Sequence, residues 1–432
     1  MEGTIIGFAL VTLLMLIGVP VAMAFGFLAF FLATWFHADP SYLLPVTFVK
    51  ISSVIILSGP LYIMLGGIIH LSGLASKLID VVMAVLGRFR GSLGAVTVVA
   101  LAVFGSVTGA DSAGIACVGT ILIPKMVEGG YPRGHSTALV ACAGVLGQLI
   151  PPSVPMIFYA LLTGQSIPFV WLATVGPAML IITTYIIMNY FMSRRFPLLV
   201  PPKLAFKDQA KTAGLALYRG IPFFILPIII LGGVYGGITT PTEAAVVGVA
   251  YMFFLLAVLR NVSLKDLGRT IYKSGATAGV IIIMLFFILI TSRILVVETI
   301  PQRMANWVVA VGRNQVIVLL MVNIIMLIMG MLMDDLSGTL LSATMLFPIV
   351  QAVGVDPIHF AAIVGVNLGL GTVTPPCAPM LYLAGRIGNC PAKEYMKPAL
   401  MLMFVGMLPV LAITTYWPWL SLVFPRLAGY LH

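Results

Sequence analysis

The sequence predicts an all-α polytopic membrane protein, built as an inverted repeat with two re-entrant helical hairpins, two discontinuous helices and about 10–12 transmembrane segments. Three observations lead to this prediction: an apolar composition, apolar runs of membrane length, and two halves that share one pattern of glycines and prolines. Of the 432 residues, 61% are hydrophobic and 8% are charged. Soluble domains carry about a quarter charged residues, so this composition excludes a water-exposed surface over most of the chain.

The apolar residues are grouped in long runs, of which 221–234, 280–290 and 317–332 are examples. A bilayer helix needs about 20 mostly apolar residues, so such runs are expected to lie in a membrane of the inner-membrane type. The net charge of +10 does not indicate a nucleic-acid partner, because the basic residues lie at the ends of the apolar runs and form no single patch. The expected partner of this surface is the lipid bilayer.

An internal duplication is visible when the chain is compared with itself. Residues 71–105 align without a gap on residues 296–330, at an offset of 225. We therefore expect a first repeat at 1–200, a cytoplasmic connection at 201–218 and a second repeat at 219–432. With one residue deleted, further matched pairs follow: Pro124 and Pro348, Gly130 and Gly354, Gly147 and Gly371, and Pro151-Pro152 and Pro375-Pro376.

The basic residues orient the two repeats. The positive-inside rule places 17 of the 23 Lys and Arg residues in the cytoplasm. The second copy then starts five crossings after the first, so the two copies are predicted to be inverted. Inverted repeats recur in secondary transporters, because exchanging the conformations of the copies converts an outward-open state into an inward-open one.

Four interruptions of the apolar runs occupy matched positions in the two repeats. A single glycine or proline break is usually an ordinary kink, but four matched breaks indicate binding sites in the middle of the membrane. In chain order they are a hairpin at about 92–130 with its tip at 105–114, a helix at about 135–163 broken at 144–153, a hairpin at about 315–353 with its tip at 330–338, and a helix at about 357–385 broken at 369–376.

These interruptions offer oxygen ligands for a cation. Prolines remove amide donors, so carbonyl groups lose their partners, and serine and threonine at the tips add hydroxyl oxygens. Such neutral, hard ligands favour Na⁺, while Asp111, Asp334 and Asp335 at the tips leave H⁺ coupling open. A buried charge costs about 3 kcal/mol or more in a membrane. The three aspartates are therefore functional candidates, with capping of the hairpin helices as the alternative role.

Several short motifs follow one another in a characteristic order along essentially the whole chain. They are Gly18-Val19-Pro20, Gly59-Pro60-Leu61-Tyr62-Ile63, Ser72-Gly73-Leu74-Ala75, Gly105-Ser106, Ile123-Pro124-Lys125-Met126 with Gly130-Tyr131, Ile150-Pro151-Pro152-Ser153, Thr242-Glu243-Ala244-Ala245, Met333-Asp334 and Thr374-Pro375-Pro376. In this order the motifs resemble the large membrane subunit, the DctM-like M subunit, of the tripartite ATP-independent periplasmic (TRAP) transporters.

The resemblance implies an elevator-type uptake system, in which a domain carrying both hairpins and both broken helices slides against a scaffold. It implies Na⁺ as the coupling ion, a small four-helix membrane subunit of the Q type, and a periplasmic substrate-binding protein of the P type. Family substrates are mostly small organic anions, including C4-dicarboxylates and sialic acids. The implied location is the bacterial inner membrane.

The family's sites carry over by motif. The chain departs from the family at the first tip, where Thr108-Gly109-Ala110-Asp111 stands in place of a segment often richer in adjacent serines. The implied first sodium site comprises Ser106, Thr108, Gly147, Ile150 and Pro152. The implied second sodium site comprises Met333, Asp334, Ser337, Gly371, Thr374 and Pro376. The substrate is expected between the two tips, with Thr108, Asp111, Ser153 and Asp335 as candidate residues.

Other functions remain open at this point. The chain could be a stand-alone Na⁺- or H⁺-coupled anion symporter or exchanger that needs no soluble binding protein. It could also be a passive channel, since symmetry alone does not exclude one. A membrane-embedded enzyme would need a nucleophile and a base in reach of each other, and the sequence contains no Walker loop, nucleophile elbow or zinc motif. We therefore expect no enzymatic activity.

Overall fold

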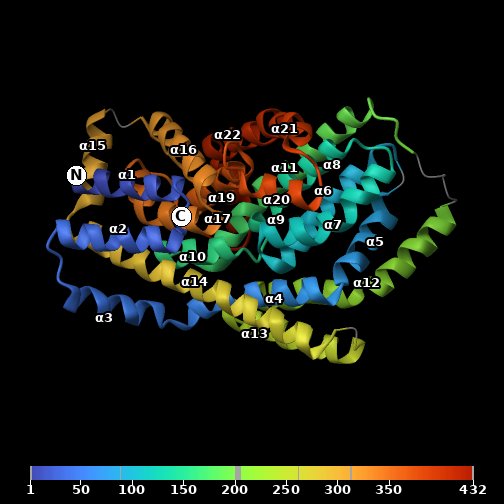
Figure 1. Ribbon diagram of the computed structural model, residues 1–432, viewed down its shortest axis with the longest axis horizontal. Coiled ribbons are helices and arrows are strands. Elements are labelled where there is room, and N and C mark those ends of the chain that lie inside the picture. The colour runs from blue at the N-terminus through green and yellow to red at the C-terminus, as the bar shows by residue number, and fades with distance from the viewer. Residues whose placement is uncertain (1, 88, 200–205, 261, 312–313, 431–432) are drawn as a thin grey trace.

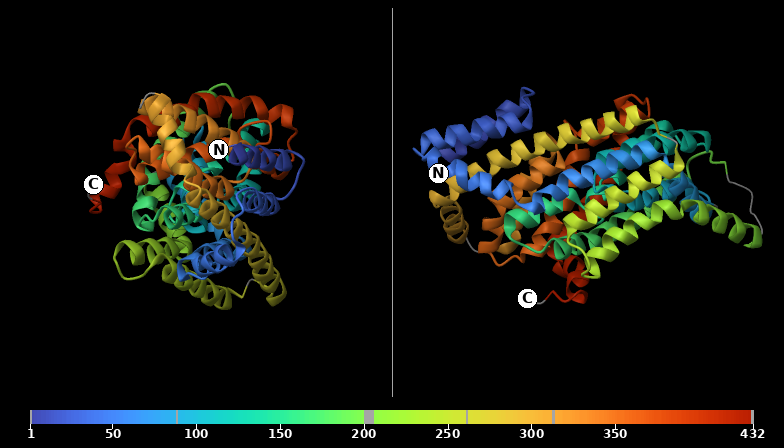
Figure 2. Two further views of the ribbon diagram at one scale, coloured as in Figure 1. Left: turned by 90° about the vertical axis from the view of Figure 1, so that its left-hand side faces the viewer. Right: turned by 90° about the horizontal axis from the view of Figure 1, so that it is seen from below.

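The computed structural model describes residues 2–87, 89–199, 206–260, 262–311 and 314–430, and every regular element in these ranges is helical. Most helices lie along the longest axis of the molecule (Figure 1), and Figure 2 shows the same bundle end-on and from below. Trp171, Tyr62 and Tyr159 are fully buried between the helices. Large apolar side chains also cover the outside, among them Ile228 and Phe254 at 69% and 67% exposure, as expected for a surface that faces lipid.

Among the described residues, seven helices are long and apolar enough to cross a membrane, or eight if one bent pair counts as a single span. The expected number of about 10–12 is therefore too high by this criterion. A 17-residue helix is only about 26 Å long, less than the roughly 30 Å of a bilayer core. Four apolar helices fall at or below this length: Glu2–Leu16, Val21–Trp35, Ser92–Thr108 and Pro357–Val373.

The N-terminal elements form short helices because proline and polar caps divide the apolar sequence. Gly18 has a φ of +89° and Pro20 precedes the second helix, so the first apolar stretch splits in two. Asp39 caps the third helix by accepting a hydrogen bond from Ser41 N at 2.9 Å. The elements are α1 (Glu2–Leu16), α2 (Val21–Trp35), α3 (Pro40–Ile51), the 3₁₀ turn η1 (Val54–Leu57), α4 (Ser58–Ser72) and α5 (Leu74–Leu86).

The first helical hairpin consists of α6 (Ser92–Thr108) and α7 (Asp111–Glu128), which pack against each other. It is followed by an interrupted helix made of α8 (Arg133–Gly144), α9 (Leu146–Leu149) and α10 (Val154–Thr163). The chain bends by 42° at the interruption. Prolines cannot donate to a helical ladder, which explains why the helix stops there.

Long helices connect the two halves of the chain. They are α11 (Ile167–Ser193), α12 (Phe206–Tyr235), α13 (Pro241–Leu259) and α14 (Leu264–Val297). The 34-residue helix α14 packs along both α2 and α4 (Figure 1). Its length lets one continuous element contact both the N-terminal helices and the centre of the molecule.

The second hairpin begins with α16 (Gln315–Leu332) and returns through α17 (Asp335–Leu341), the π-helical segment η2 (Ser342–Leu346) and α18 (Phe347–Ala352). A second interrupted helix follows as α19 (Pro357–Val373) and α20 (Pro379–Ile387). In Figure 1, α7 lies toward the right-hand end and α16 toward the left-hand end, while α9 and α17 lie near the middle. The remaining elements are α15 (Ile300–Val311), α21 (Ala392–Met401), the π-helical segment η3 (Leu402–Met407), α22 (Leu408–Tyr416) and α23 (Pro418–Leu427).

Candidate functional site

The tip of the first hairpin packs against the break in the first interrupted helix. A Cβ atom on Gly105 would lie 2.6 Å from Gly147 Cα, and one on Gly147 would lie 2.7 Å from the Ala110 carbonyl oxygen. Gly109 has a φ of +63°, and its carbonyl oxygen accepts a hydrogen bond from Val154 N at 3.3 Å. Side chains cannot be accommodated at such distances, so glycine allows the two backbones to meet.

The second hairpin meets the second interrupted helix in the same way. A Cβ atom on Gly371 would lie 2.6 Å from Gly330 Cα, and one on Gly330 would lie 3.0 Å from Gly371 Cα. Gly330 aligns with Gly105, and Gly371 aligns with Gly147, in the comparison of the chain with itself. Each tip is therefore docked on a break by a matched pair of glycines.

The residues expected at the first sodium site all lie at this tip or break. Ser106 is half-buried and Thr108 is buried, and each hydroxyl donates to a carbonyl one turn earlier, at 2.7 Å and 3.2 Å respectively. Their oxygen lone pairs remain available to a cation. Ile150 follows α9 directly, and the Pro152 carbonyl oxygen lies against Gly109. The tip and the break thus together supply hydroxyl and carbonyl oxygens.

The residues expected at the second sodium site are partly used in local hydrogen bonds. Asp334 caps α17, accepting from the Ser337 backbone N at 3.4 Å and from the Ser337 hydroxyl. The Thr374 hydroxyl donates to a carbonyl one turn earlier at 2.6 Å, and the Pro376 carbonyl accepts from a tyrosine hydroxyl of α20 at 3.0 Å. Met333 is buried directly after α16. The capping role left open for Asp334 is thus present in the structure.

A cavity of about 530 Å³ lies between the two hairpin tips. Three of the four candidate substrate residues, Thr108, Asp111 and Asp335, line it together with Asp334. Ser153 is not among the lining residues; it is fully buried, and its carbonyl accepts a hydrogen bond from the Trp171 indole at 3.1 Å. The structure therefore brings the three tip aspartates to one cavity and leaves Ser153 outside it.

Four polar side chains of this cavity come from outside the hairpin tips, and the sequence predicted no binding role for them. Lys273, Ser274 and Thr277 come from α14, and His70 comes from α4. No local pattern in the sequence shows that α14 passes beside the hairpin tips, because that contact arises from tertiary packing.

Gln148 connects the two halves of the chain at the same place. With its amide oriented so that both polar atoms have partners, it donates to Asp335 Oδ2 at 3.1 Å and accepts from Gly369 N at 3.2 Å. Gln148 lies in the first interrupted helix, whereas Asp335 begins α17 and Gly369 lies in α19. No group of three or more His, Cys, Asp or Glu side chains among the described residues has the geometry to hold a metal ion.

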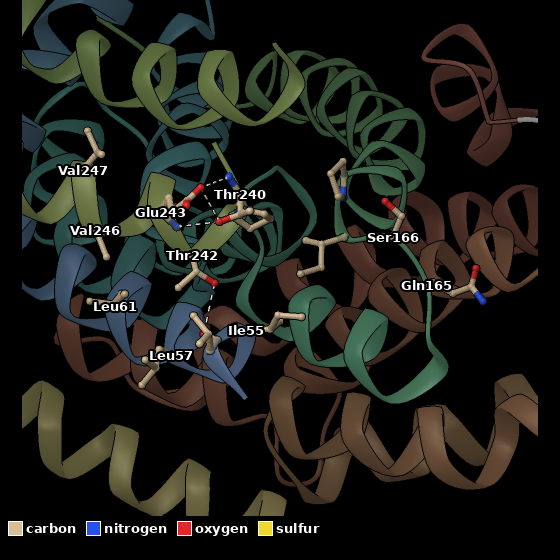
Figure 3. Close-up of a pocket in the computed structure, with 14 residues that line it drawn as sticks. Ile55, Leu57, Leu61, Gln165, Ser166, Thr240, Thr242, Glu243, Val246 and Val247 are labelled. Atoms are coloured by element: carbon tan, nitrogen blue, oxygen red, sulfur yellow. Dashed lines mark hydrogen bonds between the residues drawn. The ribbon is translucent and has the colours of Figure 1, made fainter. Parts of the chain in front are cut away.

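A larger cavity, of about 830 Å³, lies where α4, α10–α11 and α12–α13 come together (Figure 3). Its wall is mostly apolar and includes Leu57, Leu61 and Val246. Glu243 is the sole carboxylate among the lining residues, and it is already hydrogen-bonded to Thr240 N at 2.8 Å in a capping box. The cavity between the tips, with its hydroxyls and carboxyls, is therefore the better candidate for a polar ligand.

The sequence matches a known family over nearly its whole length. The family profile described as "Tripartite ATP-independent periplasmic transporter, DctM component" matches residues 8–420. The chain is 34% identical over 375 residues to the C4-dicarboxylate TRAP transporter large permease protein DctM of Pseudomonas aeruginosa, covering 87% of each chain. It is 31% identical over 426 residues to the isethionate TRAP transporter permease protein DctMQ of Oleidesulfovibrio alaskensis, covering 96% of this chain and 65% of that protein.

The fold also resembles a transporter structure at much lower sequence identity. The YdaH transporter of Alcanivorax borkumensis superposes with a TM-score of 0.61 at 15% identity, covering 90% of both chains. At this identity the likeness shows the fold alone, a multi-span helical membrane protein. The chain belongs to the DctM component family of the tripartite ATP-independent periplasmic transporters, and it is a transporter permease, not an enzyme.

Proposed function

We propose that the chain is the translocating subunit of a Na⁺-coupled secondary transporter that takes up a small organic anion. The observation that carries the proposal is the docking of each hairpin tip on a helix break of its own half, at Gly105–Gly147 and Gly330–Gly371. In both places, carbonyl and hydroxyl oxygens lie where the regular hydrogen bonding of the helix is interrupted. Such oxygens at broken helices coordinate coupling ions in secondary transporters.

Na⁺ is the coupling ion in this proposal, with one ion at each tip and break. The oxygens of Ser106, Thr108 and the break at 147–152 would hold the first ion. The tip at 333–337, with Gly371 and Thr374, would hold the second. Neutral oxygen ligands suit a hard monovalent cation.

The proposed mechanism is an elevator. Both hairpins and both interrupted helices would form the moving domain, and α4 and α14 would belong to the scaffold. Two facts support this division: Gln148 joins the first break to the second tip and the second break, and side chains of α4 and α14 line the cavity between the tips. A ligand bound there would sit at the boundary between the moving part and the fixed part, as alternating access requires.

The family relationship supports the proposed partners and location. A protein named DctMQ extends beyond the region that matches this chain. We propose a small four-helix Q-type subunit, a periplasmic P-type protein that delivers the substrate, and a position in the bacterial inner membrane with inverted repeats and re-entrant hairpins. Relatives are named for C4-dicarboxylates, isethionate and sialic acid, so the proposed substrate class is a small organic anion, for example a carboxylate such as a C4-dicarboxylate or a sialic acid.

Reconstitution tests the proposal against its alternatives. The full chain and its small subunit would be placed in proteoliposomes, and uptake would be measured with an inward Na⁺ gradient, with and without the binding protein. We expect accumulation above the external concentration that needs both Na⁺ and the binding protein. Uptake without the binding protein would indicate a stand-alone symporter, and equilibration without accumulation would indicate a channel. Accumulation driven by a proton gradient alone would show that H⁺, and not Na⁺, is the coupling ion.

A further inference from the structure

The cavity between the hairpin tips carries more acidic than basic groups. Its lining includes the carboxyl groups of Asp111, Asp334 and Asp335, and the ammonium group of Lys273. The three carboxyl groups are close enough to interact electrostatically with one another. A simple dicarboxylate has no hydrogen-bond donor to offer these carboxyl groups, because an ionised carboxylate only accepts hydrogen bonds.

Asp111 has an oxygen atom without a partner. The residue is only 2% exposed. Its Oδ1 accepts a hydrogen bond from Ser112 N at 2.6 Å, whereas its Oδ2 is buried and has no hydrogen-bond partner. A buried carboxylate oxygen left unpaired is costly, so a ligand that donates to it would remove a free-energy penalty as well as form a bond.

The other two aspartates differ from Asp111 because protein groups already bind them. Asp334 accepts from Ser337, and Asp335 accepts from the Gln148 amide at 3.1 Å. Asp335 is 9% exposed and therefore still borders the cavity. Asp111 is therefore the carboxyl group to which a ligand could supply the missing donor, because protein groups already donate to Asp334 and Asp335.

The polar side chains that α14 contributes to the cavity suit a negatively charged group of a ligand. Lys273, Ser274 and Thr277 lie on α14, successive turns of which face the cavity. Ammonium and hydroxyl groups are donors for a carboxylate or sulfonate. The Thr277 hydroxyl already donates to the Lys273 carbonyl at 3.1 Å, so Lys273 and Ser274 are the donors that α14 offers to a ligand.

We propose that the ligand of this cavity is zwitterionic: a small organic acid that also carries a protonated amine. Its ammonium group donates to Asp111 Oδ2, and its acid group binds Lys273 and the Ser274 hydroxyl. This inference rests on the proposed function and narrows its substrate class. An ammonium group placed among three carboxyl groups forms charge-assisted hydrogen bonds, which are about twice as strong as neutral ones.

Matched pairs of probes test the inference on the purified full chain in detergent. Succinate and L-aspartate differ by one amino group, and isethionate and taurine differ by a hydroxyl in place of an amino group. The apparent Kd of each probe would be taken from the concentration dependence of the thermal unfolding midpoint. We expect the aminated member of at least one pair to bind about tenfold more tightly than its partner, and we expect Asp111→Asn to remove that preference.

Asp80→Asn is the control, because it makes the same change at an exposed position on α5. Equal affinity within both pairs in the unmodified chain, tighter binding of the non-aminated members, or no response to either aminated probe would overturn the inference. The wild-type comparison decides this even if the Asp111 variant does not fold. A loss of Na⁺-specific stabilisation in Asp111→Asn with an unchanged amine preference would also overturn it, by assigning Asp111 to the cation. The stabilisation of the wild-type chain by NaCl relative to KCl tests Na⁺ binding separately. A failure of the proposed Na⁺-coupled function can therefore be distinguished from a failure of the proposed amine preference.

Discussion

Gly105 and Gly147 meet backbone to backbone, so closely that a Cβ atom on Gly105 would lie 2.6 Å from Gly147 Cα. Gly105 precedes the turn of the first hairpin, and Gly147 lies in the short helix before the first break. The aligned pair, Gly330 and Gly371, repeats this contact in the second half. A side chain added at such a contact should therefore disturb the docking of the hairpin tip on the helix break.

Gly105→Ala is expected to destabilise the protein by about 1–3 kcal/mol and to abolish Na⁺-driven uptake, because the added methyl group must push the tip away from the break. Thermal unfolding and uptake in proteoliposomes would measure the two effects. Gly275→Ala is the matched control, since a Cβ atom at this position of α14 would meet no other atom within 4 Å. Normal uptake by Gly105→Ala would show that the tight contact is not needed for transport.

Thr374→Ala is expected to raise the Na⁺ concentration for half-maximal uptake by about fivefold, the equivalent of roughly 1 kcal/mol for one lost oxygen ligand. Thr183→Ala serves as the control, because its exposed hydroxyl makes the same kind of bond to the preceding turn, at 2.8 Å, on α11. We expect Ser106→Ala to behave like Thr374→Ala. An unchanged Na⁺ dependence in both site variants would remove Ser106 and Thr374 from the proposed sodium sites.

Asp334→Asn separates the capping role from a transport role. Asparagine caps helices about as well as aspartate, so the thermal stability of this variant should change little. If the negative charge takes part in transport, uptake should fall about tenfold or more while the amount of inserted protein stays normal. Asp39→Asn is the control, because Asp39 caps α3 at an exposed site. Wild-type uptake by Asp334→Asn would leave capping as its sole demonstrated role.

The inverted arrangement predicts labelling from opposite sides of the membrane. Lys211 and Gln351 are both exposed, and Cys377 is the exposed native cysteine among the described residues. In a Cys377→Ser background, Lys211→Cys should react with an impermeant thiol reagent only from the cytoplasmic side. Gln351→Cys should react only from the periplasmic side. Reaction of both cysteines from the same side would contradict the inverted repeat.

Several features of the fold follow from local sequence. Composition and apolar runs predict a helical membrane protein because the bilayer imposes the same requirement on each segment separately. Glycine and proline predict where helices stop, since their effects act on neighbouring residues: α9 ends just before Ile150-Pro151-Pro152, and α19 ends just before Thr374-Pro375-Pro376. The number of spans was overestimated because hydropathy cannot distinguish a helix that crosses the membrane from one that is too short to do so.

The sequence alone determined the membrane environment, the family and the four interruptions of regular helix, because these depend on local composition and on motifs contiguous in the chain. Only the tertiary structure decided that Gln148 reaches Asp335, that Lys273 and His70 face the hairpin tips, and that Ser153 turns its carbonyl to Trp171 instead of lining the cavity. These relationships join residues that are far apart in the sequence, such as Gln148 and Asp335. They are set by the packing of whole helices, which no local pattern records.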